Sequence, residues 1–203
     1  MATDLTALVA NLRSTCSFAR CSLVSVGAGG GQLVDVYADA ARLAAVDPDA
    51  AALARLRAAL AERELLDRCS FHAVDFMAFA ARADVVLFEF SLHELDDPAA
   101  ALRHAAGLAP RVVVFDHSPG STWAYHTAEE ERVRASTAAI IAAGPTAVRT
   151  FEAEQRFADH AALLAKIAGQ GPVAVARAAA FQGERDLVIP MEYLAATLPG
   201  AAR

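Results

Sequence analysis

Apolar residues along this chain gather in short continuous runs, which polar residues, glycine or proline separate. The runs predict strands at 22–27, 42–47, 69–74, 84–90 and 111–115, because a strand that is covered on both faces is apolar throughout. Between several of them, apolar residues recur three and four positions apart, as on the inner face of a helix. Alternating strands and helices favour a parallel sheet with helices on both sides.

The helices are predicted from their end signals as well as from periodicity. Proline suits the first helical position, so Asp47-Pro48 and Asp97-Pro98 predict helix starts, and Gly107 predicts the end of the second helix. Thr127-Ala128-Glu129-Glu130 resembles a capping box and predicts a helix that runs to about residue 143. Further helices are predicted at 2–20, 31–41 and 152–168.

The last part of the chain has a different pattern. Two β-like runs, 172–181 and 185–193, are joined by Gln182-Gly183-Glu184, which predicts a hairpin. Together with the five preceding strands, it predicts an α/β fold of three layers, with a seven-stranded, mostly parallel sheet and a C-terminal antiparallel hairpin. The 203 residues fit one domain. Its expected parts are an N-terminal helix at 1–20 and a core at 21–203, which includes a helical lid at 117–170.

The first strand runs into a glycine-rich turn, Gly27-Ala28-Gly29-Gly30-Gly31. A buried strand that turns sharply into a helix needs glycine for backbone angles closed to other residues, and for a ligand that lies directly on the backbone. The second strand ends at Asp47, where a carboxylate can bind a pair of ribose hydroxyls. This pattern predicts an adenosine-type cofactor on a Rossmann-like sheet.

Composition and charge exclude some classes of binding partner. Hydrophobic residues make up 56% of the chain and charged residues 21%, which is typical of a folded domain. The net charge is -6 and no basic cluster is present, which argues against DNA or RNA as a partner. No apolar run approaches the roughly 18 residues of a membrane span, and the N-terminus lacks a signal-peptide pattern. The cysteines form no C-x-x-C pair, so we expect a cytoplasmic protein with reduced thiols at Cys16, Cys21 and Cys69.

Over roughly residues 20–193, the chain resembles the class I S-adenosylmethionine-dependent methyltransferases. Their glycine motif has the form G-x-G-x-G, which Gly27, Gly29 and Gly31 match, and their sheet ends in a hairpin with one antiparallel strand. The dinucleotide fingerprint G-x-G-x-x-G would need glycine or alanine where Gln32 stands, so a nicotinamide-dependent oxidoreductase is the weaker alternative. The resemblance implies S-adenosylmethionine as cofactor and methyl transfer as the reaction.

The resemblance also implies a cofactor site along the carboxyl ends of the first four strands. Asp47 would bind the ribose hydroxyls, Pro48 would contact the adenine face, and Asp75 would accept from the adenine amino group. The remaining implied contacts lie in the glycine loop, beside the adenine ring or at the methionine end: Gly27, Ala28, Gly29, Gly31, Phe76, Glu89, Phe90 and Ser91. The family often has an acidic residue two positions before the first glycine, where this chain has Ser25.

An acceptor pocket is predicted beyond the ends of strands four and five, because ligands of open α/β sheets bind at the carboxyl edge. Either His93 or His117 is predicted as a general base, since histidine titrates near neutral pH. Trp123, Tyr125 and His126, in the following loop, are predicted to contact the acceptor. The alternative for each histidine is a helix cap or a bond to a backbone carbonyl.

Several alternatives remain at this stage. His93, Asp116 and His117 would also suit a divalent metal, but they match the acidic ligand pattern of metal-dependent O-methyltransferases only in part, so no metal site is predicted. Strand four lacks the Asn/Asp-Pro-Pro-aromatic motif of many N-methyltransferases. A small-molecule acceptor is therefore expected, and a non-catalytic relative that binds the cofactor or a partner chain is the alternative function.

Overall fold

The computed structural model describes residues 5–29 and 31–200, and it contains one seven-stranded sheet among them. The strand order is β3-β2-β1-β4-β5-β7-β6, with β7 antiparallel to both of its neighbours. The predicted fold class is therefore confirmed. The strands are β1 Ser22–Val26, β2 Arg42–Val46, β3 Cys69–His72, β4 Val85–Glu89, β5 Arg111–His117, β6 Ala147–Asp159 and β7 Arg185–Pro199.

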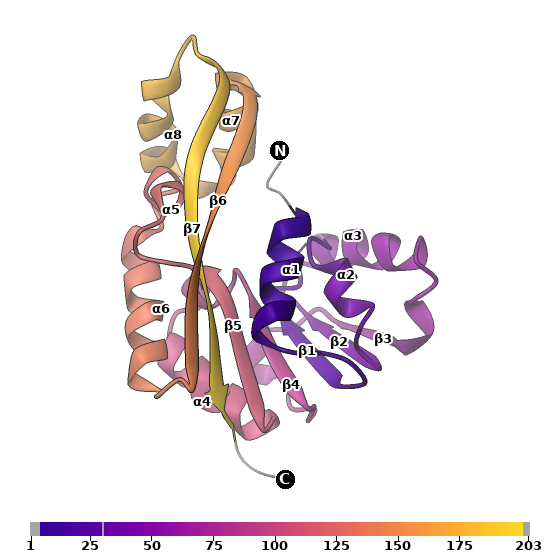
Figure 1. The fold of residues 1–203 in the computed structure, drawn as a ribbon. Helices are drawn as coiled ribbons and strands as arrows, with labels where there is room; N and C mark the ends of the chain where they lie inside the picture. Colours follow the sequence, from indigo (N-terminus) through magenta and orange to yellow (C-terminus); the bar gives the residue numbers. More distant parts are fainter. Residues whose placement is uncertain (1–4, 30, 201–203) are drawn as a thin grey trace.

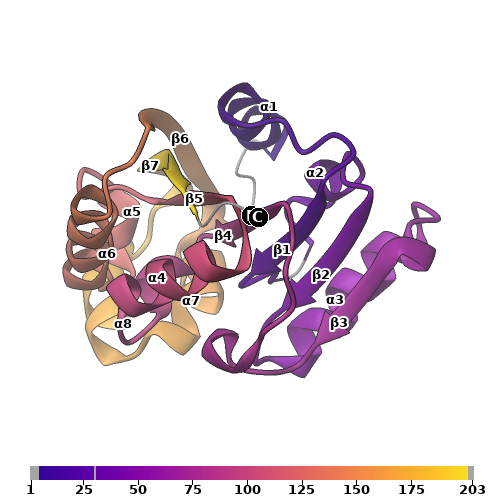
Figure 2. The same cartoon turned by 90° about the horizontal axis from the view of Figure 1, so that it is seen from below.

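Helices cover both faces of this sheet (Figures 1 and 2). They are α1 Leu5–Thr15, α2 Val34–Tyr37, α3 Ala50–Ala61, α4 Pro98–Leu108, α5 Thr122–His126, α6 Glu130–Ala142, α7 His160–Ile167 and α8 Pro172–Ala178. Short 3₁₀ turns are η1 Leu66–Arg68, η2 Phe76–Ala78, η3 Leu92–Glu94, η4 Ala168–Gln170 and η5 Ala179–Phe181. Among the described residues, no helix is both long and apolar enough to cross a membrane.

The continuous apolar strands contribute side chains to two separate hydrophobic cores, one on each face of the sheet. Val85 and Leu87 of β4 face the core that includes α1, α2 and α3, while Val86 and Phe88 face the core that includes α4 and α6. Both sets are fully buried, as expected for a strand between two helical layers. The three cysteines are free.

The largest differences from the sequence prediction lie in the last third of the chain. The antiparallel pair exists, but its strands are β6 and β7, which α7 and α8 separate along the chain. In Figure 1 these two helices flank the upper end of the pair. The predicted strand at 172–181 is wrong, because Pro172 opens α8 and its alanines favour a helix. The predicted helix at 152–168 is wrong in its first half, which is β6. The expected lid segment 117–170 thus contains α5, α6 and α7, but also this long strand.

The remaining corrections concern element ends. The helix after β2 begins at Ala50 rather than at Asp47-Pro48, and Asp49 is its N-cap because the Asp49 side chain accepts from the Ala51 amide. The predicted helix 31–41 shrinks to α2, and the described part of the predicted 2–20 helix is α1; residues 1–4 lie outside the described residues. Thr127 does not cap α6, because the residue directly before this helix is Glu129. The strand predicted at 111–115 extends further, to His117.

Candidate active site

The glycine loop lies at the carboxyl end of β1, beside β4. Gly27 has a φ of +66°, and a Cβ added there would lie 2.2 Å from Cβ of Ser91. Ser91 follows β4 and donates through Oγ to the carbonyl oxygen of Val26 over 2.8 Å. Only glycine fits where this backbone approaches β4 so closely. The loop is therefore anchored at the point where the strand order reverses, which is the usual ligand crevice of such sheets.

Asp47 holds the far side of this loop. Its carboxylate accepts from the Gly29 amide over 3.2 Å and from the Asp49 amide over 2.8 Å. The side chain is largely buried, whereas the neighbouring Pro48 is exposed. An added Cβ at Gly29 would meet only the Gly27 carbonyl oxygen, at 3.4 Å, so no other described atom lies close above the loop there. The structure thus joins the predicted ribose-binding carboxylate directly to the predicted methionine-binding loop.

The other predicted cofactor residues lie around this crevice. Gly31 packs on α3, because its added Cβ would lie 3.3 Å from Cβ of Ala59. Asp75 is exposed after β3 and accepts from the Met77 amide over 2.7 Å. The Phe76 ring is buried in the core, edge-to-face with Phe88, so only its backbone remains for an adenine contact.

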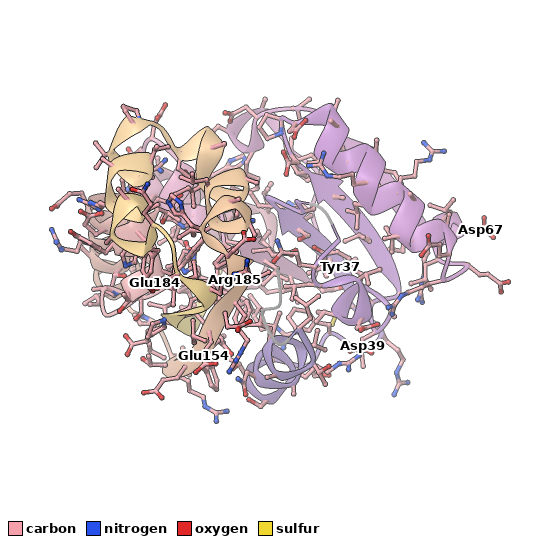
Figure 3. All side chains as sticks on the ribbon, turned by 90° about the horizontal axis from the view of Figure 1, so that it is seen from above. Tyr37, Asp39, Asp67, Glu154, Glu184 and Arg185 are labelled. Carbon is pink, nitrogen blue, oxygen red and sulfur yellow. The ribbon has the colours of Figure 1, made fainter. Side chains whose placement is uncertain are left out.

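A buried polar network lies below the loop and includes a residue that the sequence did not single out. Tyr37 of α2 contacts both Oγ of Ser25, at 3.0 Å, and a carboxylate oxygen of Glu89. Tyr37 is buried, and Figure 3 shows it well away from Asp67, which lies at the edge of the molecule. Burial raises the pKa of Glu89 to about 8, although the hydrogen bond from Tyr37 opposes this. Ser25 itself is not acidic, but Tyr37 connects it to a buried carboxyl on the adjacent strand, that of Glu89.

A second cluster forms beyond β4 and β5, as predicted from the sheet. His93 in η3 contacts Oδ1 of Asp116 through Nδ1 over 2.5 Å, and its Nε2 lies 3.7 Å from Oε1 of Glu129. The Asp116 carboxylate also accepts from the backbone amides of His93 and His117. All four side chains are buried. The structure therefore brings both predicted bases together with two carboxylates.

The two histidines have opposite electrostatic environments. Burial alone would lower the pKa of His93, but the charge and hydrogen bond of Asp116, together with Glu129, raise it to about 10. Burial lowers the pKa of His117 to about 4, and the positive charge of His93 adds to this effect. At neutral pH the protein alone therefore carries a charged His93 beside a neutral His117.

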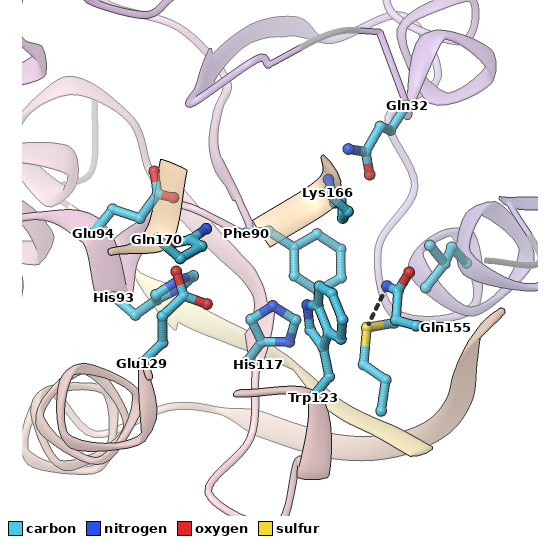
Figure 4. Close-up of a pocket in the computed structure, with 12 residues that line it drawn as sticks. Gln32, Phe90, His93, Glu94, His117, Trp123, Glu129, Gln155, Lys166 and Gln170 are labelled. Carbon is cyan, nitrogen blue, oxygen red and sulfur yellow. Dashed lines mark hydrogen bonds and ion pairs between the residues drawn. The ribbon is translucent and has the colours of Figure 1, made fainter. Parts of the chain in front are cut away.

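His93, His117 and Glu129 line a pocket of about 160 Å³ (Figure 4). Trp123 borders it and stacks on Phe157, with ring centroids 5.7 Å apart. Phe90 also borders it and adopts a positive φ of 48°, an uncommon backbone conformation for an aromatic residue. The lining residues are Leu8, Gln32, Phe90, His93, Glu94, His117, Trp123, Glu129, Gln155, Lys166, Gln170 and Met191.

Two of the predicted acceptor residues lie elsewhere. Tyr125 is about half exposed, and the Arg177 guanidinium lies over its ring at 4.0 Å. His126 contacts the ring of Phe181, with centroids 5.0 Å apart. Neither residue lines the pocket that contains His93 and His117. Of the three, only Trp123 lies where the sequence prediction expected it.

Glu129 is the principal residue that sequence analysis missed, since the run Glu129-Glu130-Glu131 is typical of a solvated helix start. Instead, Glu129 is 3% exposed and accepts from Oγ1 of Thr127 over 2.7 Å. A signal was present, because the buried face of α6 is Val133, Ser136 and Ile140. Glu129 precedes Val133 by four residues and so extends that inner face.

Comparison with known proteins agrees with this arrangement. A family model described as a methyltransferase domain matches residues 24–111, which include the glycine loop, Asp47 and β4. No curated protein matches the chain in sequence.

Solved structures share the fold over nearly the whole chain. A Bacillus halodurans C-125 protein, provisionally described as a methyltransferase, aligns with a TM-score of 0.70 at 14% identity, over 98% of this chain and 99% of that one. Magnesium protoporphyrin IX methyltransferase from Synechocystis PCC 6803, with bound S-adenosylhomocysteine, aligns with a TM-score of 0.58 at 14% identity, over 95% of this chain and 80% of that one. A Pyrococcus horikoshii protein, provisionally described as an RNA methyltransferase, aligns with a TM-score of 0.60 at 16% identity, over 98% of this chain and 83% of that one.

The matched domain contains the glycine loop and the acidic residue after β2, and the complete sheet has the methyltransferase strand order. Residues 24–111 are therefore similar to a methyltransferase domain, and the chain as a whole has the Rossmann-like fold of the solved structures.

Proposed function

We propose that this protein transfers a methyl group from S-adenosylmethionine to a small molecule bound in the pocket beside β4 and β5. The observation that carries this proposal is the buried cluster of His93, Asp116, His117 and Glu129 beside the cofactor crevice. Ionisable groups buried in a pocket are typical of sites where a proton must be moved. The pocket volume of about 160 Å³ lies below the roughly 300–1,000 Å³ of drug-sized ligand sites, which favours a small acceptor group.

The residues around the crevice fit the cofactor. The loop leaves its backbone free for close approach at Gly29, and Asp47 is fixed beside it to accept the ribose hydroxyls. Asp75 is positioned by the Met77 amide near the end of β3, where the adenine amino group is expected. When bound, S-adenosylmethionine supplies a methyl group on a positively charged sulfur, and the protein contributes alignment and the exclusion of water.

Ser25 occupies the position where the family often has an acidic residue, and Glu89 is proposed to take over the role of that residue. Its carboxyl is buried and contacts Tyr37, which in turn contacts Ser25. A cofactor ammonium next to this carboxyl would favour its ionised form. Binding of S-adenosylhomocysteine near pH 7 should then release close to one proton, measured by calorimetry in buffers of different ionisation enthalpy.

The acceptor must lose a proton during or after methyl transfer when its nucleophile is a hydroxyl, thiol or protonated amine. His93 and His117 are the proposed catalytic residues, since both line the pocket. Near pH 7 the neutral His117 would accept the proton, and the charged His93 would donate a hydrogen bond to the acceptor. Trp123 is proposed to bound the acceptor. A small molecule is favoured over RNA because the net charge is -6 and Lys166 is accompanied in the pocket by Glu94 and Glu129. A cytoplasmic location, expected from the free thiols, belongs to the same proposal.

The test is a methyl-transfer assay with S-adenosylmethionine and a panel of phenols, alcohols, carboxylic acids and amines, plus an RNA arm. We expect turnover with at least one small molecule. His93→Ala and His117→Ala should lower kcat by about 10²–10⁴ while S-adenosylhomocysteine affinity stays nearly unchanged. His72→Ala, at a partly exposed position on β3, is the matched control and should retain full turnover.

Three results would contradict the proposal in distinguishable ways. Cofactor binding without transfer to any acceptor would indicate a non-catalytic relative. Transfer to RNA alone would overturn the acceptor class. A rise in melting temperature with NAD but not with S-adenosylhomocysteine would overturn the cofactor assignment, because a ligand stabilises the state that binds it.

A further inference from the structure

Three potential metal ligands from three separate elements meet at the base of the pocket. His93 lies in η3, His117 ends β5, and Glu129 directly precedes α6. A ligand atom of each lies within 4.8 Å of the others. The side chains are 2%, 7% and 3% exposed, respectively, so this is a buried cluster rather than a chance meeting of surface groups. Figure 4 shows all three at one side of the pocket, away from Gln32 and Gln155.

The surroundings of His93 orient it as a ligand. Nδ1 is held by Asp116 at 2.5 Å, which leaves Nε2 facing Glu129 at 3.7 Å. Asp116 is itself fixed by the backbone amides of His93 and His117. A carboxylate that holds the outer nitrogen of an imidazole, so that the inner nitrogen faces the ion, is the usual support of metal-binding histidines. Asp116, weighed as a ligand from the sequence, therefore orients His93 instead.

His117 and Glu129 supply independent support. Nδ1 of His117 is buried and has no hydrogen-bond partner among the described residues, although the side chain is more than nine-tenths buried. Buried polar atoms normally have a partner, so an orphaned imidazole nitrogen in a pocket points to an absent ligand. Glu129 is positioned by Thr127 at 2.7 Å and Arg132 at 3.3 Å, which hold its carboxylate at the cluster.

We propose that His93, His117 and Glu129 bind one divalent transition-metal ion of the zinc type, with an open coordination position that faces the pocket. Two imidazoles and one carboxylate are a donor set for zinc or iron(II), whereas magnesium and calcium prefer oxygen donors. Bonds of about 2.1 Å in tetrahedral geometry separate ligand atoms by roughly 3.4 Å. The His93–Glu129 separation of 3.7 Å is close to this value. Binding displaces the proton from Nε2 of His93, as at any imidazole ligand.

The open position gives the ion a role in the proposed function, on which this part of the inference rests. An acceptor oxygen or nitrogen bound there would lose its proton more easily, because a zinc-type ion lowers the pKa of what it binds. The metal site itself does not require that methyl transfer occur, so the two proposals can fail separately.

The test measures metal binding directly on the full chain after chelator treatment. Zinc should bind at one ion per chain in competition with a chromophoric chelator, and cobalt(II) should give the visible absorption bands of a four- or five-coordinate site. His93→Ala, His117→Ala and Glu129→Gln should each lower zinc affinity at least about 100-fold, and Asp116→Asn about 10–100-fold. Glu131→Gln, two residues from Glu129 but exposed, is the matched control and should bind as the unmodified protein does.

Circular dichroism and melting temperature establish that each variant is folded. If a substitution to alanine prevents folding, His117→Gln keeps a similar size and should still lose the cobalt spectrum. Stoichiometric zinc binding that none of these substitutions weakens would overturn the site, as would no zinc binding by the folded, unmodified protein. Methyl transfer that continues without any bound ion would refute the open-position role alone. Zinc binding without methyl transfer would contradict only the proposed function.

Discussion

Replacing Glu89 with glutamine should change how the stability of this protein depends on pH. The Glu89 side chain is 5% exposed, and burial raises its pKa to about 8, while a glutamate in the unfolded chain titrates near 4.3. Between these values the folded protein holds a proton that the unfolded chain has released. The free energy of unfolding therefore falls as pH rises through this window, and the full loss is reached above pH 8.

The magnitude follows from the width of the window. Each pH unit between the two pKa values costs about 1.4 kcal/mol, and the slope flattens as the folded pKa is approached. From pH 6 to pH 8, Glu89 should therefore lower the free energy of unfolding by about 2 kcal/mol. Glutamine keeps the size of the side chain and its oxygen acceptor for Tyr37 but does not titrate. Glu89→Gln should remove this decrease.

Urea denaturation of both proteins at pH 6, 7 and 8 measures the effect. The other titrating groups contribute equally to both proteins, so the difference between the two pH profiles isolates Glu89. We expect the variant to gain stability relative to the unmodified protein as pH rises. Parallel profiles would refute the reasoning, because they would mean that Glu89 releases its proton at the same pH in the folded and unfolded states.

Three further substitutions test the cofactor crevice. Asp47→Ala should weaken S-adenosylhomocysteine binding at least about tenfold in calorimetry, since charge-assisted hydrogen bonds to the ribose are lost; the exposed Asp67→Ala is the control, and equal affinities would contradict the assignment. Gly29→Val should abolish binding in a protein that circular dichroism shows to be folded, and normal binding would disprove the close-approach argument. Gly27→Ala should lower the free energy of unfolding by more than about 2 kcal/mol in urea, because its Cβ would lie 2.2 Å from that of Ser91; an unchanged midpoint would argue against it.

Features that depend only on residues close together in the sequence were predicted well. The apolar runs of β1, β2, β4 and β5 and the glycine turn after β1 are each complete within a few residues, and the parallel sheet follows from their order. The meeting of His93 with Asp116 was also predicted, because adjacent parallel strands end at the same edge.

Features that depend on tertiary packing were predicted poorly. In β6, residues such as Glu152, Glu154 and Arg156 have helix-forming side chains, and only pairing with β7 along its whole length makes the segment a strand. Burial of Glu129 depends on where α6 docks, and the role of Tyr37 depends on Glu89, which is distant in sequence. Propensity contains no information about such partners, so a sequence of this kind predicts strands and turns better than contacts between buried side chains.

The position of β7 has a consequence for synthesis of the protein. Although β7 is the last strand along the chain, it lies between β5 and β6, and β6 pairs with no other described strand. As the chain leaves the ribosome, β1 to β5 can assemble while β6 must wait without a partner. Closing the sheet then requires insertion of β7 between two waiting edges, a late and long-range step. We therefore expect nascent chains stalled before residue 185 to expose the edges of β5 and β6, where chaperones or aggregation would act first.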